Sequence, residues 1–512
     1  MPATGANANG QPQRQAPRTP AEAAAYVHND ALADRVDLGA RGVDFIIAGV
    51  DASQEALDKQ AVARTDAIAR NKEIDADYKK AKADYKKAKK EQAQKAKRGE
   101  EQTKVPEVEK PQHKVVPPSP RMKKHREAAD HLAKSAQKMR KNAAAARTLP
   151  VPVPDTLIEL ESTGLEATAG KIAPLTDPEH VESTRDLAVG MRHGNQAMLD
   201  RLFSRPIGFS SKSLEYQSSL GDTNGKSSVY RANYLGIAPV GIKVSREDDS
   251  MAPEEDETVR EAQTMHALRG GDNLLKGGTR ASDKRAFVMQ LASKGNLAQA
   301  GAALQSLPLS DRLETWQYLM QGGFTGLAGL HAKGLAHADV KNQNILLDDH
   351  YTPTLMDFGT TGEETTRSDS GTAAYMAPEV RSTGNANRAS DVWSMGESLL
   401  FGLFGRNSVD FAMGKRNTPN TERFEEECAK KGLLADGAWL GKVEQELLAQ
   451  AGPEAPTGPE SDVGRVMDFL RKTMSLDPTQ RLSSADALKH DFLKLKDGAK
   501  ERSVERLKRA RP

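Results

Sequence analysis

Two short runs of the sequence combine the residue types that phosphoryl transfer needs. They are His337-Ala-Asp339-Val-Lys341-Asn-Gln-Asn344 and Asp357-Phe358-Gly359. Asp357 lies thirteen positions after Asn344. This reaction needs a carboxylate beside the attacking hydroxyl, and oxygen ligands for a metal ion that neutralises the phosphates. The two runs therefore predict a site for phosphoryl transfer.

The two runs resemble the catalytic and metal-binding loops of eukaryotic-type protein kinases, which read H-R-D-x-K-x-x-N and then D-F-G. The resemblance implies that Asp339 orients and deprotonates the substrate hydroxyl and that Lys341 contacts the transferring phosphate. It also implies ATP as the cofactor and a metal ion held by Asn344 and Asp357. Mg²⁺ is expected, and Mn²⁺ stays open because both ions accept oxygen ligands.

Other stretches are similar to family motifs that contact ATP. Val240-Gly-Ile-Lys243 is similar to the strand motif V-A-I-K, which implies that Lys243 contacts the α- and β-phosphates. Eighteen residues later, Glu261 lies in an expected helix and is implied to pair with Lys243. A buried strand should then lead to the interlobe hinge, where the backbone of Gln290 and Ala292 is implied to bind adenine.

The loop that covers the phosphates departs from the family pattern. Residues 220–232 end in a sequence like the family's V-Y-x-A, which begins at Val229. Of the three glycines that the family has before it, only two are found here, Gly221 and Gly225. Either the loop is one residue longer and these glycines cover the phosphates, or the loop contacts the phosphates more loosely.

Structural motifs of the family follow in order. They are Gly371-Thr-Ala-Ala-Tyr-Met-Ala-Pro-Glu379, Asp391-Val-Trp-Ser-Met-Gly396 and Asp477-Pro-Thr-Gln-Arg481. By resemblance, Asp391 braces the catalytic loop and Arg481 forms a salt bridge with Glu379. The similarity extends from Leu214 to Leu493 and implies an α+β, bilobal protein kinase fold with a β-rich N-lobe and a helical C-lobe.

Three residues bear on regulation and on the acceptor. Many regulated kinases have arginine where this chain has Ala338, and that arginine pairs with a phosphorylated activation loop. Activation by loop phosphorylation should therefore matter less here. Lys341 and Thr372 favour serine or threonine as the acceptor, since tyrosine kinases of this superfamily usually have a different catalytic-loop sequence.

Composition and proline positions predict how the 512 residues are organised. We expect a disordered N-terminus with a secretion signal (1–50), a long Lys/Ala-rich helix (51–104), proline-rich linkers around a basic helix (105–154), an N-terminal extension (155–213), the kinase domain (214–495) and a basic tail (496–512). One cysteine, Cys428, excludes an intrachain disulfide and fits a reducing compartment. No apolar run approaches the length of a membrane span.

The long helix contains a tandem repeat, ADYKKAK, from residue 76 to residue 89. Its seven-residue spacing places Tyr78, Ala81, Tyr85 and Ala88 on one stripe, so both a solvated single helix and an interface with a partner helix stay open. Ten Lys or Arg residues between Lys79 and Arg98 predict weak contact with an anionic membrane. The net charge of +2 and the absence of an aromatic platform argue against a specific nucleic-acid partner.

The N-terminus has no acidic residue before Glu22 and no leucine before Leu32, and it resembles the export signals of type III secreted effectors. The whole chain looks like an effector kinase of a plant-pathogenic bacterium, delivered by a type III-like route into the host cytoplasm. Its protein substrate would then be a host signalling protein, such as a signalling kinase. One alternative is a housekeeping kinase of the bacterial cytoplasm. Another is a catalytically weak pseudokinase scaffold that binds a signalling partner.

Overall fold

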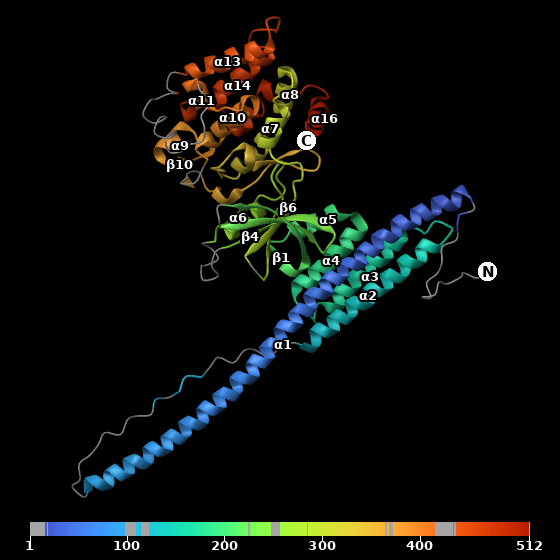
Figure 1. Cartoon of the computed structure of the whole chain (residues 1–512), viewed down its shortest axis with the longest axis vertical. Helices are drawn as coiled ribbons and strands as arrows, with labels where there is room; N and C mark the ends of the chain where they lie inside the picture. Colours follow the sequence, from blue (N-terminus) through green and yellow to red (C-terminus); the bar gives the residue numbers. More distant parts are fainter. Residues whose placement is uncertain are drawn as a thin grey trace. The chain divides into compact units, whose positions relative to one another are not determined.

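The computed structural model (Figure 1) describes residues 16–17, 19–97, 109, 111–113, 122–223, 226–246, 256–283, 285–363, 366–367, 372–414, 434 and 437–510. The chain forms two compact units. The helical unit comprises Met1–Met198, Lys212–Glu215 and Leu235–Ile237. The two-lobed unit comprises Leu199–Ser211, Tyr216–Tyr234 and Ala238–Pro512.

The helical unit is built on one very long helix. Its helices are α1 (Pro20–Lys97), α2 (Met122–Thr148), α3 (Thr156–Ile172) and α4 (Pro178–His193), and α5 (Asn195–Phe203) leads out of it. The helix α2 packs along α1, and α3 packs on α4. Positions seven residues apart on α1 are fully buried, namely Asn29, Val36, Val43 and Val50. This spacing keeps them on one face of the helix, which forms the core of the unit.

The predicted disorder over residues 1–50 is wrong from Pro20 onward, because α1 begins there. The backbone N–H of Glu22 donates to the Thr19 hydroxyl at 3.1 Å, and that of Thr19 donates to the Glu22 carboxylate at 3.2 Å. This reciprocal cap and the proline at the first helical position are both signals of a helix start. Composition concealed the helix because many of its buried positions are alanines. Residues 1–15 lie outside the described residues.

The N-lobe of the two-lobed unit is a six-stranded sheet in the order β1-β5-β6-β4-β3-β2. The strands are β1 (Ile207–Phe209), β2 (Leu214–Thr223), β3 (Ser227–Tyr234), β4 (Ala238–Ser245), β5 (Gly277–Ala281) and β6 (Ala286–Gln290). One helix, α6 (Glu257–Ala267), accompanies the sheet. Lys243 of β4 pairs with Val229 of β3 on one side and Phe287 of β6 on the other, so its place in the sheet is fixed by two neighbours.

The C-lobe is mainly helical. Its helices are α7 (Leu297–Leu304), α8 (Leu309–His331), α9 (Pro378–Thr383), α10 (Arg388–Phe404), α11 (Ser408–Met413), α13 (Ala438–Ala451), α14 (Asp462–Thr473), α15 (Ser484–Ala487) and α16 (Ala499–Arg509). Two small two-stranded sheets pair β7 (Ile345–Leu347) with β8 (Pro353–Leu355), and β9 (Thr366–Arg367) with β10 (Asn385–Ala386). The predicted α+β bilobal architecture is confirmed.

The C-terminal segment differs from the predicted basic tail (496–512), because α16 packs against α8. Leu507 of α16 is buried, and Arg502 and Arg506 both donate to Glu314, each at 2.6 Å. Arginines that read as a solvated tail therefore pair with a carboxylate of the lobe. Across the described residues, no helix combines the length and the apolar character that a membrane crossing requires.

Candidate active site

A lysine between two carboxylates lies where the sheet meets α6. The ammonium nitrogen of Lys243 is 2.5 Å from Glu261 Oε2 and 3.7 Å from Asp357 Oδ1. Asp256 caps the start of α6 by accepting from the N–H of Thr258 at 2.8 Å, which fixes the helix that presents Glu261. The pairing of Lys243 with Glu261 that the resemblance implied is therefore present in the structure.

Burial sets the charges of this group. It raises the pKa of Glu261 to about 7, because desolvation outweighs the attraction of Lys243. Burial alone would lower the pKa of Lys243, but the carboxylates of Glu261 and Asp357 outweigh it and raise that pKa. Lys243 therefore stays cationic at neutral pH, and a buried cation of this kind can bind phosphate oxygens.

A second cluster surrounds Asp339. Lys341 Nζ donates to Asp339 Oδ2 at 2.6 Å and to Thr372 Oγ1 at 3.0 Å. The Asn344 amide donates to Asp339 Oδ2 at 3.1 Å, and the Thr372 N–H donates to Asp339 Oδ1 at 3.2 Å. Each carboxylate oxygen of Asp339 thus accepts a hydrogen bond from a neighbour. These bonds hold the carboxylate in one orientation.

Asp391, at the start of α10, binds the backbone of the catalytic loop at His337 and Ala338. Asp391, which is 1% exposed, accepts from the backbone N–H of His337 at 2.7 Å and from that of Ala338 at 2.9 Å. Ala338 has φ +66°, a left-handed conformation that costs energy for a residue with a Cβ. His331 also contacts Asp391, at 2.9 Å. His331 was missed in the sequence because it belongs to no motif and is brought there only by the packing of α8.

The residues expected to hold the metal fit a magnesium site. Asn344 uses its amide N–H₂ on Asp339, which leaves its carbonyl oxygen as a ligand, and Asp357 supplies a carboxylate. Within the described residues no group of three or more His, Cys, Asp or Glu could form a protein cage for a metal. Mg²⁺ is commonly bound by one or two protein oxygens together with substrate phosphates, so this pair of side chains suffices.

The backbone around Asp357 orients its side chain. Asp357 has φ +66°, and the next residue, Phe358, is buried with its ring 5.7 Å from that of His337. The ring nitrogen Nε2 of His337 lies 2.9 Å from the carbonyl oxygen of Met356. Since the aromatic ring is packed inward, the carboxylate of Asp357 lies on the side of Lys243.

The hinge begins at Gln290, the last residue of β6, and Ala292 lies two residues further along the chain. The N–H of Gln290 donates to the carbonyl of Lys276 at 2.7 Å, so this N–H is already occupied and cannot bind an adenine. Ala292 is half-buried. Gly241 stands in the alanine position of the strand motif, and a Cβ there would lie 3.1 Å from Met289 Cγ. A glycine therefore suits the close approach of β4 to β6 at this point.

The phosphate-covering loop is described in part. Val229 is half-buried against the core, and Gly221 is exposed with φ +147°. Gly225 lies outside the described residues. The sequence motifs assign no role to Lys226, whose ammonium nitrogen lies 3.0 Å from Glu257 Oε2 on α6. Its position beside the expected phosphate-covering glycine was the signal that could have drawn attention to it.

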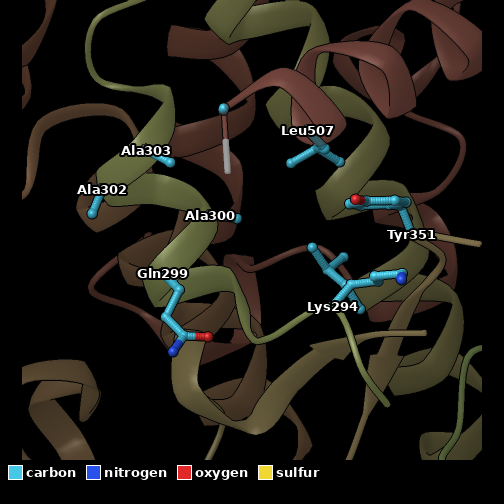
Figure 2. A pocket seen from close by; sticks show the side chains of 9 residues that line it. Lys294, Gln299, Ala300, Ala302, Ala303, Tyr351 and Leu507 are labelled. Atoms are coloured by element: carbon cyan, nitrogen blue, oxygen red, sulfur yellow. The ribbon is translucent and has the colours of Figure 1, made fainter. Parts of the chain in front are cut away.

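A separate cavity of about 760 Å³ lies in the C-lobe between α7, α16 and the turn before β8. Figure 2 shows Tyr351 and Leu507 facing it, with Lys294 at one side. Its lining shares no residue with the clusters around Lys243 and Asp339. The cavity is therefore distinct from the site of the expected chemistry.

Comparison with known proteins points to one family. The model of the protein kinase domain matches residues 217–493. The chain is 31% identical over 279 residues to a probable receptor-like serine/threonine-protein kinase of Arabidopsis thaliana, covering 50% of this chain and 59% of the relative. It is 29% identical over 267 residues to mitogen-activated protein kinase kinase kinase 20 of the same plant, covering 50% and 64%.

A third relative is the serine/threonine-protein kinase GIN4 of Saccharomyces cerevisiae, which is 29% identical over 214 residues, or 40% of this chain and 16% of the relative. The chain thus spans less than two thirds of the length of each of these three relatives.

Proposed function

Because the chain belongs to the protein kinase family, we propose that its two-lobed unit transfers the γ-phosphate of ATP to serine or threonine hydroxyls of proteins. The observation that supports this most is the contact set of Asp339, which places a carboxylate, the ammonium of Lys341 and the amide of Asn344 within hydrogen-bond distance of one another. A pseudokinase scaffold would have no need of this geometry.

In this proposal each residue has one task. Asp339 accepts the proton of the acceptor hydroxyl as its oxygen attacks phosphorus, and Lys341 stabilises the charge of the phosphoryl group in transfer. Lys243, held by Glu261, binds phosphate oxygens of ATP. Asn344 and Asp357 would hold Mg²⁺, which would supply positive charge to neutralise the phosphates, and Mn²⁺ is the second metal to test.

The contact between Lys341 and Thr372 supports the choice of acceptor. Thr372 Oγ1 lies 3.0 Å from Lys341 Nζ and 3.3 Å from Asp339 Oδ1. This threonine connects the catalytic loop to the end of the activation segment, beside the place where an aliphatic hydroxyl must reach Asp339. We expect serine and threonine peptides to be phosphorylated and tyrosine peptides not.

The test is transfer of labelled γ-phosphate from ATP to a generic basic protein substrate, with Mg²⁺ and in parallel with Mn²⁺. Wild type is compared with Asp339→Asn and with Asp349→Ala, which changes an exposed carboxylate on the turn between β7 and β8. We expect Asp339→Asn to lose roughly 10²–10⁴-fold in rate and Asp349→Ala to keep the wild-type rate. If wild type binds ATP yet transfers no label with either metal, the pseudokinase scaffold replaces the kinase.

We further propose that the protein is exported by a type III-like route and phosphorylates a host signalling protein, such as a signalling kinase. The support is the acid-poor N-terminal composition, together with the helix that begins only at Pro20. A reporter fused to residues 1–19 should be exported in a secretion-dependent way, whereas one fused to residues 20–50 should be retained. Retention of both reporters, or of one carrying residues 1–50, would contradict export.

A further inference from the structure

The face of α1 that is buried in the helical unit continues far along the helix. Seven-residue steps from Val50 lead to Arg64, Asn71, Tyr78 and Tyr85, and the accompanying positions are Ala67, Ile74, Ala81 and Ala88. Figure 1 shows this part of α1 extending beyond α2, α3 and α4. Most of these positions are buried or half-buried, whereas the charged residues on either side of them are exposed. The spacing is that of a coiled-coil seam, in which two positions per heptad face a partner helix.

The charges that flank this seam are arranged in order along the helix. On one side lie Arg70, Asp77 and Asp84, each directly before a residue of the Asn71, Tyr78 and Tyr85 series. On the other side lie Asp75, Lys82 and Lys89, each directly after a residue of the Ile74, Ala81 and Ala88 series. In a parallel pair of helices, a residue of the first side faces the residue five positions later on the other chain. All three such pairs combine opposite charges.

From this charge pattern we infer that residues 64–89 of α1 pair with the same residues of a second copy of this chain, as a parallel, in-register, two-stranded coiled coil. Arg70 then faces Asp75 of the second copy, Asp77 faces Lys82 of the second copy, and Asp84 faces Lys89 of the second copy. Each pair occurs twice in the symmetric dimer. An antiparallel dimer over the same residues is disfavoured because it would bring Asp77 beside Asp77 of the second copy.

Two further details agree with a parallel pair. Asn71 occupies a seam position, where a single asparagine favours a two-stranded, in-register arrangement at a cost in stability. The ammonium groups of Lys82 and Lys89 each lie 5.7 Å from the ring centre of Tyr78 and Tyr85 respectively, which holds both lysines next to the seam. In the single chain, the linker residue His113 contacts Asp75 at 2.9 Å, so pairing replaces this contact.

The first experiment is sedimentation of the full-length protein over roughly 1 to 100 µM, which covers moderate dimer affinities. We expect a reversible dimer in wild type. The variant Lys82→Asp/Lys89→Asp should weaken it by roughly 100-fold, because four attractive pairs become repulsive. The matched control Lys80→Asp/Lys87→Asp makes the same charge change on the same helix, two residues from each seam-flanking lysine, and should dimerise like wild type.

The second experiment restores the lost contacts. Asp77→Lys/Asp84→Lys should also fail to dimerise alone, yet it should form a 1:1 dimer when mixed with Lys82→Asp/Lys89→Asp. In a Cys428→Ser background, Ala81→Cys chains should form an interchain disulfide when oxidised glutathione takes up the two electrons and two protons of the thiols. A thiol placed at residue 81 meets its equivalent only if the helices are parallel and in register.

Every outcome bears on the inference, and none depends on phosphate transfer. A monomer at all concentrations would overturn it, as would failure of the mixed variants to pair. The same variants are tested for binding to vesicles that contain one-third phosphatidylserine. If no dimer forms, and Lys82→Asp/Lys89→Asp and Lys80→Asp/Lys87→Asp weaken vesicle binding equally, this stretch binds an anionic membrane instead.

Discussion

Arg481 donates two hydrogen bonds to the carboxylate of Glu379, at 2.6 and 2.8 Å. The two residues lie 102 positions apart, and the Arg481 side chain is 0% exposed. Its guanidinium also lies 5.0 Å from the ring of Trp393. One buried cation thus joins the end of the activation segment to the last part of the C-lobe.

Replacing this cation should be costly. Arg481→Ala leaves Glu379 unpaired and should lower the free energy of unfolding by about 3–5 kcal/mol, measured by urea denaturation. Arg481→Lys should recover only part of the loss, since an ammonium cannot make both bonds in one plane. Lys489→Ala removes an exposed partner of Asp486 and should leave stability nearly unchanged. Equal effects of Arg481→Ala and Lys489→Ala would contradict a structural role for the buried pair.

Asp391 should act on turnover and not on ATP binding. Asp391→Asn removes one of the acceptors that hold the N–H groups of His337 and Ala338, so the catalytic loop loses its fixed position. A displacement of this kind can cost about 100-fold in kcat. We expect kcat to fall by about that factor while KM for ATP changes little, because Lys243 and the hinge are not touched. A rise in KM with unchanged kcat would place the effect of Asp391 elsewhere.

The raised pKa of Glu261 predicts a pH dependence. Above pH 7 the carboxyl is ionised and pairs with Lys243, whereas below pH 7 it takes up a proton and the pair is lost. We therefore expect kcat/KM for ATP to fall as the pH drops from 8 to 6, since this ratio reports the free enzyme. Glu261→Gln should lower the ratio at pH 8 and flatten the profile in this range. An unchanged profile in that variant would assign the titration to another group.

Close packing around Trp316 predicts a sharp difference between two glycines. A Cβ at Gly402 of α10 would lie 2.0 Å from the Trp316 ring, so Gly402→Ala should destabilise the protein by about 1–3 kcal/mol. Gly441 of α13 has nothing within 4 Å of the same position. Gly441→Ala should therefore be neutral or stabilise by about 0.5–1 kcal/mol, as alanine does inside a helix. Thermal unfolding of both variants checks this contrast.

The sequence was sufficient to predict that Asp339, Lys341 and Asn344 lie together, because all three belong to one short motif. Asp339, Lys341 and Asn344 lie within six residues of one another, so their closeness is almost a local property. Lys243 and Glu261 needed the family resemblance, since only the sheet and α6 bring them together. His331 could not be predicted, because its contact with Asp391 depends on how α8 packs against α10.

The N-terminal half was harder to predict for a physical reason. Buried positions of α1 include Ala25, Ala33 and Ala40, which add little apolar character to a sequence window although they pack fully. Basic α2 reads as a solvated helix, yet Arg147 pairs with Asp34 and Asp37 of α1, each at 2.6 Å. Composition gives only the average polarity of a segment. The packing of these helices depends on which face of the helix each residue occupies, and an average does not contain that information.

The length of α1 has a mechanical consequence. At about 1.5 Å of rise per residue, its 78 residues measure roughly 117 Å from end to end. The glycines of this helix are Gly39, Gly42 and Gly49. All three lie in the part of α1 that packs against other segments of the helical unit. The part from Val50 to Lys97 has neither glycine nor proline to act as a hinge. A force or torque applied near Lys97 is therefore transmitted along a stiff helix to the packed helices of the helical unit.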